Sequence, residues 1–272
     1  MVPRVARWSS RTFWAGALSL ALVLNSSHVQ GQTFPPDPVD RTVFTLQWEK
    51  PFFPGLGGLA AWSSILEADV IFRVGPGQSV QLGMPIAIAG ADAVDGTSLF
   101  LHNLRFSVLF GEPGALNGFL SLTVPTASNV RGPDLAVVVG VLPYLEEFEK
   151  WGDDAFSVRG AWTPFRPIGG GQLGLRLGGA AVAPIDLVNV FVYARAAGWG
   201  RFPAGNAELR ADLETSYLVN DDHGFGERFI AYLNLGAALS GAGGHPGLFI
   251  RIPLDADARD VLDFSIGLTA RF

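Results

Sequence analysis

The sequence has no cysteine, little charge and almost no lysine. The absence of cysteine excludes a disulfide scaffold, a Cys-ligated zinc site and a thiol nucleophile. Only 16% of the 272 residues are charged, against about 25% in an average soluble protein, which is too little charge to coat an ordinary soluble surface. Lysine occurs only at Lys50 and Lys150. The 49% hydrophobic content excludes disorder, and scattered arginines with a net charge of −6 indicate no nucleic-acid partner.

Long hydrophobic runs are also missing. Beyond residue 30, no apolar run approaches the roughly 18 residues that a membrane-spanning helix needs. The longest candidate, Leu135 to Pro143, has half that length. The chain is therefore hydrophobic without containing hydrophobic helices.

The N-terminus has the pattern of a secretory signal peptide. Arg4, Arg7 and Arg11 form a positive region, residues 13–24 are an unbroken apolar core, and residues 29–31 offer a small-residue cleavage site. The alternative is a short membrane anchor, which the length of the core disfavours. No cysteine follows the core, which argues against a lipoprotein.

We therefore divide the chain into three parts. Residues 1–31 are the expected signal peptide, residues 32–41 a proline-rich, extended periplasmic lead-in, and residues 42–272 the folded domain. Removal of residues 1–31 deletes three arginines and no acid, so the net charge falls from −6 to −9.

From Thr42 to Phe272, apolar residues occupy every second position in segment after segment, separated by Gly, Pro, Asp and Asn. This period predicts β-strands. One segment, Asp134 to Leu142, is apolar on both faces and has no clear phase. The pattern leaves no room for helices, apart from a possible turn at Leu145 to Trp151.

The polar phase of these strands distinguishes a soluble β-sandwich from a membrane barrel. A soluble sheet would place Lys, Glu and Thr on this face, whereas here small residues alternate with arginines and some acids. Small residues with scattered opposite charges suit a crowded, hydrated lumen. The predicted lumen-lining residues are Arg73, Arg105, Arg159, Arg176, Arg195, Arg210, Arg228, Arg251, Glu67, Asp69, Glu208, Asp212 and Glu214, with Arg271 and Asp263 in the same phase.

The last eleven residues alternate without a break and end in an aromatic ring at Phe272. In this the chain resembles bacterial outer-membrane β-barrel proteins, whose final strand ends in a Phe that the barrel-assembly machinery recognises. The resemblance implies an outer-membrane location, contact with outer-membrane lipid, and an assembly signal formed by Phe264, Ile266, Leu268, Ala270 and Phe272. We predict an all-β, antiparallel, up-and-down transmembrane β-barrel.

The strand number follows from length. The 231 residues from Thr42 onward, at roughly 20 residues per strand with its connection, give about 12 strands, and 14 remains an alternative. Thirteen apolar segments can be counted, one too many for an even-stranded barrel. The suspect regions are Leu99 to Pro164 and the short segment Leu248 to Leu254.

Catalytic ingredients are sparse, and we expect neither an enzyme nor a cofactor. After cleavage only His102, His223 and His245 remain, and none has a serine one or two places away, as a local Ser–His arrangement would require. Asp221 and Asp222 are too few carboxylates for a calcium site. No metal site is predicted.

The arginines on the polar phase are the best indication of function. They predict a pore whose lining prefers small polar or anionic solutes; alternatively, they pair with acids and fill the barrel. A structural or adhesive barrel with a plugged lumen is the second hypothesis. The run Ser121 to Thr126 is also similar to a family of outer-membrane transporter-like proteins linked to phenol degradation, which favours transport without naming a solute.

Overall fold

The structure is a computed structural model that describes residues 36–53, 62–91, 94–131, 155–184, 190–220, 229–239 and 245–272. The expected signal peptide, the segment Asp134 to Leu142, the turn at Leu145 to Trp151, Arg228 and His223 lie outside these ranges. Among the described residues, no helix is both long and apolar enough to cross a membrane.

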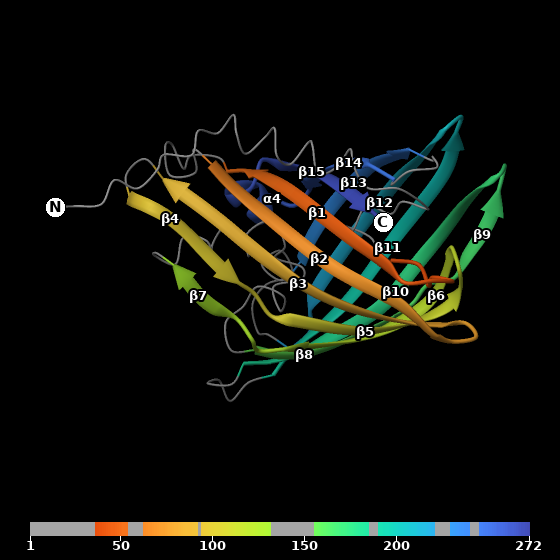
Figure 1. Ribbon diagram of the computed structural model, residues 1–272, viewed down its shortest axis with the longest axis horizontal. Coiled ribbons are helices and arrows are strands. Elements are labelled where there is room, and N and C mark those ends of the chain that lie inside the picture. Colours follow the sequence, from red (N-terminus) through yellow and green to blue (C-terminus); the bar gives the residue numbers. More distant parts are fainter. Residues whose placement is uncertain are drawn as a thin grey trace.

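The described chain is almost entirely β-structure (Figure 1). Its strands are β1 (Val43–Phe52), β2 (Trp62–Gly75), β3 (Gln78–Ala91), β4 (Val94–Leu101), β5 (Leu104–Glu112), β6 (Ala115–Val124), β7 (Ser128–Arg131), β8 (Ala155–Trp162), β9 (Phe165–Ile168), β10 (Gly171–Pro184), β11 (Phe191–Ala204), β12 (Ala207–Leu218), β13 (Phe229–Leu239), β14 (Gly247–Pro253) and β15 (Phe264–Arg271).

Within the described ranges, twelve strands close into an antiparallel barrel, which confirms the predicted fold class and strand number. The ring runs through β1, β2, β3, β5, β6, β8 and then β10 to β15, and β1 pairs with β15 to close it. Closure satisfies the backbone groups that an open edge would expose to hydrocarbon. The short strands β4, β7 and β9 extend ring strands rather than adding to the ring. They continue β5, β6 and β8 after breaks at His102–Asn103, Pro125–Ala127 and Thr163–Pro164.

The sequence contains thirteen apolar segments, one more than the ring has strands, and the segment at Leu248 to Leu254 is not the extra one. That segment forms β14, which pairs with β13 and β15. The doubtful segment at Asp134 to Leu142 falls outside the described residues. The other twelve apolar segments each correspond to one strand of the ring.

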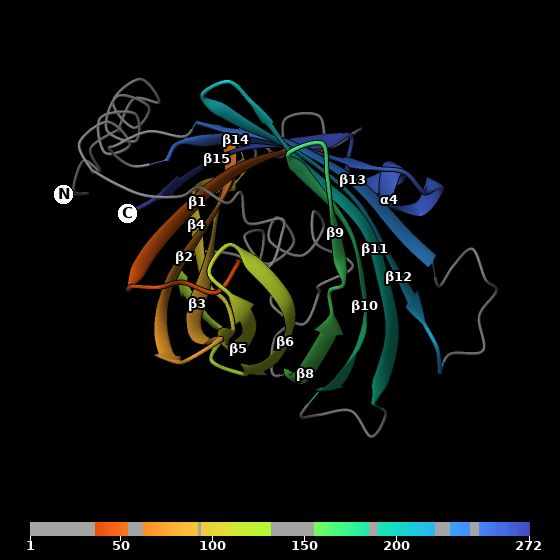
Figure 2. The same ribbon diagram turned by 90° about the vertical axis from the view of Figure 1, so that its right-hand side faces the viewer.

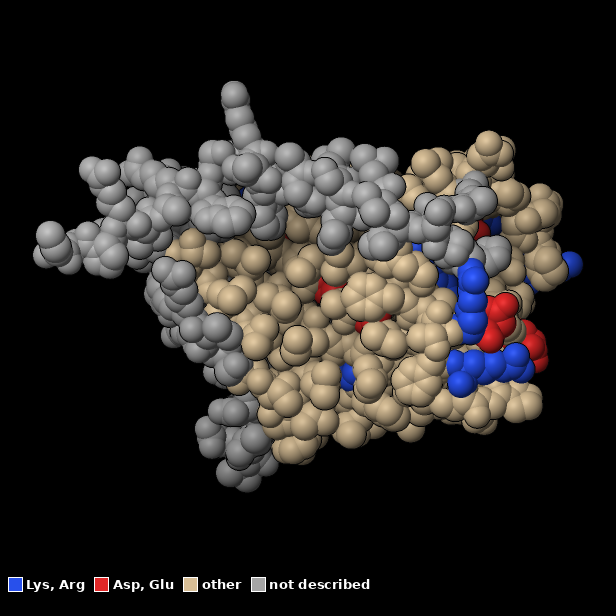
Figure 3. Space-filling view, viewed as in Figure 1, with Lys and Arg blue, Asp and Glu red and all other residues tan. Residues whose placement is uncertain are grey.

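The apolar phase of the strands faces outward. Leu120, Leu175 and Trp162 are 51%, 54% and 61% exposed, whereas their strand neighbours Ser121 and Arg176 are buried. Figure 3 shows the consequence: the described side of the barrel is largely uncharged, and Lys, Arg, Asp and Glu gather toward one end. An exposed apolar band of this kind is what a lipid-facing wall requires.

One end of the barrel carries four tight turns, and we call it the hairpin end. Its two-residue turns are Pro76–Gly77, Pro113–Gly114, Gly169–Gly170 and Gly205–Asn206. Gly169 and Gly170 both have positive φ, 57° and 83°, as the favoured two-residue hairpin turns require. The barrel's first strand begins at this end and its last strand finishes there (Figure 2).

The expectation that there is no helix is wrong in one connection. Between β14 and β15, α4 (Ala256–Val261) forms a short helix, and the Asp255 side chain caps it by accepting from the Ala258 backbone N–H. Asp255 also accepts from Ala231 on β13. An aspartate before such a hexapeptide is a helix-start signal, but the segment is too short to show a helical period.

Candidate functional site

The segment Pro36–Arg41, which we call the strap, precedes β1 and lies inside the hairpin end of the barrel. It was expected to be extended, and it contains neither helix nor strand. Pro36, Asp37, Pro38 and Val39 are all buried. The strap therefore packs against the inner wall instead of trailing away from the barrel.

Val39 anchors the strap on one side of the lumen. Its side chain packs in an apolar cluster with Val43, Ile71, Leu109, Leu116 and Phe119, all buried. Its backbone N–H donates to the Ser79 hydroxyl at 2.9 Å, and the Gly114 N–H donates to the Pro38 carbonyl at 3.3 Å. On this side of the lumen, the strap is therefore held by β3 and by the β5–β6 turn.

Asp37 anchors the strap on the other side. Its carboxylate accepts two hydrogen bonds from the Arg201 guanidinium, at 2.7 and 3.0 Å. Arg201 lies on β11, which is far from β3 in the ring order. Because the two anchors are on distant strands, the strap and the Arg201 side chain together span the mouth, and Figure 2 shows the strap entering the lumen from the start of β1.

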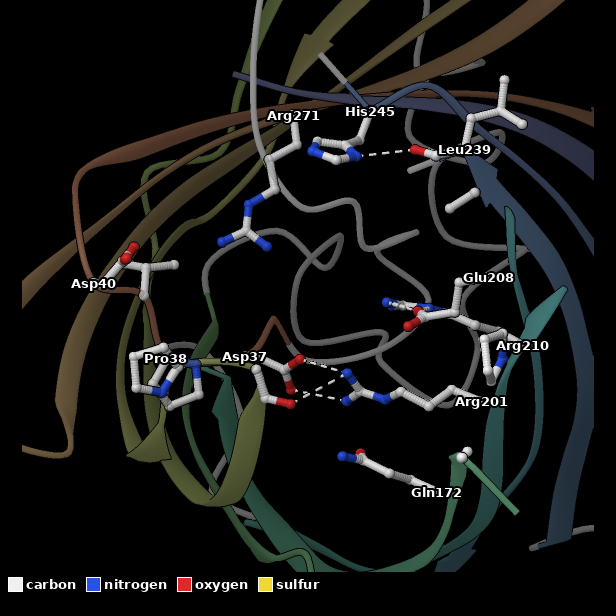
Figure 4. Close-up of a pocket in the computed structure, with 17 residues that line it drawn as sticks. Asp37, Pro38, Asp40, Gln172, Arg201, Glu208, Arg210, Leu239, His245 and Arg271 are labelled. Carbon is white, nitrogen blue, oxygen red and sulfur yellow. Dashed lines mark hydrogen bonds and ion pairs between the residues drawn. The ribbon is translucent and has the colours of Figure 1, made fainter. Parts of the chain in front are cut away.

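A cavity of about 390 Å³ lies at this mouth, and we call it the mouth cavity. Its wall is formed by the strap, by the β5–β6 turn and by residues on or next to β10 to β13 and β15, including Gln172, Arg201, Arg210, His245 and Arg271 (Figure 4). Arg210 is paired with Glu208, and His245 Nδ1 lies 2.9 Å from the Leu239 carbonyl. The mouth is thus polar and rich in guanidinium groups.

Farther into the barrel, Arg105 on β5 reaches across β3 to the acids of β2. Its Nη2 lies 2.6 Å from Glu67 Oε1 and 3.0 Å from Asp69 Oδ1. Gln81 Nε2 on β3 also donates to Asp69, at 2.8 Å. Gly83 lies under this network, and a Cβ there would collide with the Asp69 carboxylate.

A second charged cluster occupies the inner face of β8 to β12. Arg176 Nη2 lies 3.0 Å from Asp212 Oδ2, and its Nη1 lies 3.6 Å from Glu214 Oε1. Arg159 also reaches Glu214, at 3.4 Å. Arg195, on β11 between them, is buried with its guanidinium over the Tyr193 ring. Three guanidinium groups therefore share this side of the lumen with two carboxylates.

Near the opposite end, Arg251 is 1% exposed and stacks over the Tyr232 ring, with its guanidinium carbon 4.3 Å from the ring centroid. Glu49 on β1 is fully buried and accepts from the Ser265 hydroxyl. Sequence reasoning missed Glu49, although it shares the phase of Gln47 and lies opposite the apolar Trp48. A consistent reading of the phase of β1 could have found it.

The predicted lumen residues thus fall into two groups. Arg105, Arg159, Arg176, Arg195, Arg210, Arg251, Glu67, Asp69, Asp212 and Glu214 are on the inner face, and Glu208 is at the hairpin end. Arg73 is exposed at the β2–β3 turn, where it donates to the Gly75 carbonyl, and Asp263 is also exposed. With Glu49 and Asp37 added, the described inner wall carries nearly as many carboxylates as guanidinium groups.

The C-terminal residues form the closing seam of the barrel. The Phe272 N–H donates to the Phe44 carbonyl at 2.8 Å, and the Phe44 N–H donates to the Phe272 carbonyl at 3.1 Å. The two rings stack with centroids 6.1 Å apart. Phe264, Ile266 and Leu268 face outward along the same strand, whereas Ala270, in that phase, is buried.

The two described histidines lie at breaks and turns. His102 is buried at the β4–β5 break and packs on Phe100, with ring centroids 4.6 Å apart. His245 lies at the start of the β14 segment beside the mouth cavity. Within the described ranges, no three His, Asp or Glu residues are grouped so that they could hold a metal ion.

A closed twelve-strand ring with an apolar outside, a charged inside and one end of tight turns defines an outer-membrane-type β-barrel. No family model matches the chain, and no curated protein matches it. Among solved structures, the chain is similar to an outer-membrane channel from Pseudomonas putida F1 (TM-score 0.54, 13% identity, covering 90% of this chain and 99% of that chain). It is also similar to the translocator domain of the autotransporter NalP from Neisseria meningitidis (TM-score 0.51, 11% identity, covering 96% and 94%). At these identities the likeness establishes the fold alone.

Proposed function

We propose that the protein is a bacterial outer-membrane channel for small polar solutes, exported by its N-terminal signal peptide. One observation carries this proposal: the inner wall is polar and charged from Glu49 and Arg251 near one end to Arg201 and Arg210 at the other. A barrel that served only as a scaffold could fill its interior with apolar side chains, whereas a hydrated path needs such groups along its length. The similar channel from Pseudomonas putida F1 supports the proposal through the fold.

The hairpin end is proposed to face the periplasm. Outer-membrane barrels have short turns on the periplasmic side and longer loops outside. Four two-residue turns lie at the hairpin end, whereas most connections at the other end are longer. In this orientation the strap and the mouth cavity form the periplasmic opening.

A conductance measurement tests the channel. We expect discrete current steps when the folded chain is inserted into planar bilayers, in wild type or in a variant with Asp37→Asn that releases the strap. Absence of current from both proteins would contradict the channel and favour the alternative, a structural or adhesive barrel whose lumen stays closed.

The arginine-rich side of the lumen predicts a preference for anions. Arg195→Gln removes one of three guanidinium groups on β8 to β11, so we expect the anion-to-cation permeability ratio to fall. The ratio is measured as the reversal potential in a KCl gradient, with Arg73→Gln as the control because Arg73 is exposed at a turn. An unchanged reversal potential in Arg195→Gln would show that this side does not select ions.

We also propose that Phe272 and its strand act as the signal for the barrel-assembly machinery. Deletion of Phe272 removes two backbone hydrogen bonds of the seam and the stacked ring, and we expect severalfold less folded protein in outer membranes. Phe272→Tyr keeps the ring and the backbone and serves as the control. Refolding into detergent separates the two roles: a variant that refolds normally in vitro but accumulates unfolded in cells has lost recognition.

A further inference from the structure

Arg271 is a buried cation that lacks a counterion. It is 6% exposed, and in the described part of the chain its side chain makes no ion pair within 4.0 Å and no hydrogen bond. Figure 4 shows its guanidinium directed into the mouth cavity. A buried charge without a partner is costly unless water or an anion compensates it.

None of the described acids around the cavity forms an ion pair with Arg271. Asp37 and Asp40 act on Arg271 only over a longer distance. Asp37 is already held by both terminal nitrogens of Arg201, and Glu208 is paired with Arg210. Asp40 is exposed at the edge of the strap. Arg271 therefore remains available to a negatively charged ligand.

The cavity also has the size that a ligand site needs. Its volume of about 390 Å³ lies within the usual range for small-molecule sites, about 300–1,000 Å³. Gln172, on β10, lines the same cavity on the side opposite Arg271, with Asp37 and Arg201 between them (Figure 4).

We propose that the mouth cavity binds a small anion with carboxylate or phosphate groups, with Arg271 as its main contact. A guanidinium group presents paired donors that match both kinds of oxyanion. The site goes beyond the channel function, because binding requires only the folded barrel and occurs whether or not the lumen conducts. The bonds between Asp37 and Arg201 show that this mouth already accommodates a carboxylate.

The test is isothermal titration calorimetry of the folded full chain in detergent at low ionic strength. Succinate and inorganic phosphate are the two probes, and they distinguish carboxylate from phosphate recognition. We expect saturable binding of at least one probe, weakened about tenfold or more by Arg271→Gln, since a hydrogen bond to a charged group contributes about 1.5–3 kcal/mol. Arg73→Gln is the control, because Arg73 lies outside the cavity.

A second variant keeps the test decisive if Arg271→Gln does not fold, since Arg271 lies in the closing strand. Gln172→Glu places a negative charge in the cavity on a different strand, and we expect it to weaken binding severalfold. Circular dichroism verifies that each variant retains its β-structure. The proposal is overturned if the wild type binds neither probe, or if the folded variants bind as tightly as the wild type.

Discussion

Replacing Asp37 by Asn releases the strap and increases the current through the barrel. Asp37 is 2% exposed, and its carboxylate holds Arg201 through two hydrogen bonds of 2.7 and 3.0 Å. Truncating one partner of a buried, hydrogen-bonded charge pair costs about 2–5 kcal/mol. Even the lower value shifts the equilibrium between docked and released strap by about 30-fold.

Single-channel recording measures this effect as the fraction of time spent in the largest conductance state. Asp40→Asn is the matched control: it removes the same charge from the same strap, at an exposed position without an ion pair. Exchanging the charges, with Asp37→Arg and Arg201→Asp together, is expected to restore part of the wild-type behaviour. If Asp37→Asn and Asp40→Asn give the same currents as the wild type, the strap does not restrict the mouth.

The fold could be predicted from the sequence because twelve of the thirteen apolar segments alternate between residues that face lipid and residues that face the lumen. Leu120 and Leu122 alternate with Ser121 and Thr123, for example, and the structure exposes the first pair and buries the second. A one-residue slip would exchange the two faces, so the register is strongly specified. The helix at Ala256–Val261 could not be predicted, because six residues are too few to show a helical period.

The mouth could not be predicted, because its parts are far apart in the chain. Asp37 and Arg201 are separated by 164 positions, and nothing in the alternation of either segment specifies their contact. Strand phase assigns a residue to the inner face but not to a partner on another strand. For the same reason Arg105 could be placed inside, whereas its pairing with Glu67 across β3 required the three-dimensional structure.

Replacing Arg176 by Met is expected to destabilise the barrel, because it leaves a buried carboxylate without its counterion. Arg176 pairs with Asp212 at 3.0 Å and with Glu214 at 3.6 Å, and the side chains of Arg176 and Asp212 are 7% and 0% exposed. Removing one member of a buried ion pair costs about 3–5 kcal/mol, because the remaining charge is left uncompensated. Glu214 retains its ion pair with Arg159 at 3.4 Å. The lost stability therefore comes mainly from Asp212, whose carboxylate is left without a counterion.

The free energy of unfolding in guanidinium chloride, measured in detergent or lipid, gives the size of this effect. The double variant Arg176→Met, Asp212→Leu is expected to recover part of the stability, because replacing both charges with apolar groups leaves no unpaired ion. Arg73→Met controls for the loss of an arginine at an exposed turn and is expected to change stability by less than about 0.5 kcal/mol. A double variant as unstable as Arg176→Met alone would mean that packing around Arg176, rather than its charge pairing with Asp212, stabilises this side of the lumen.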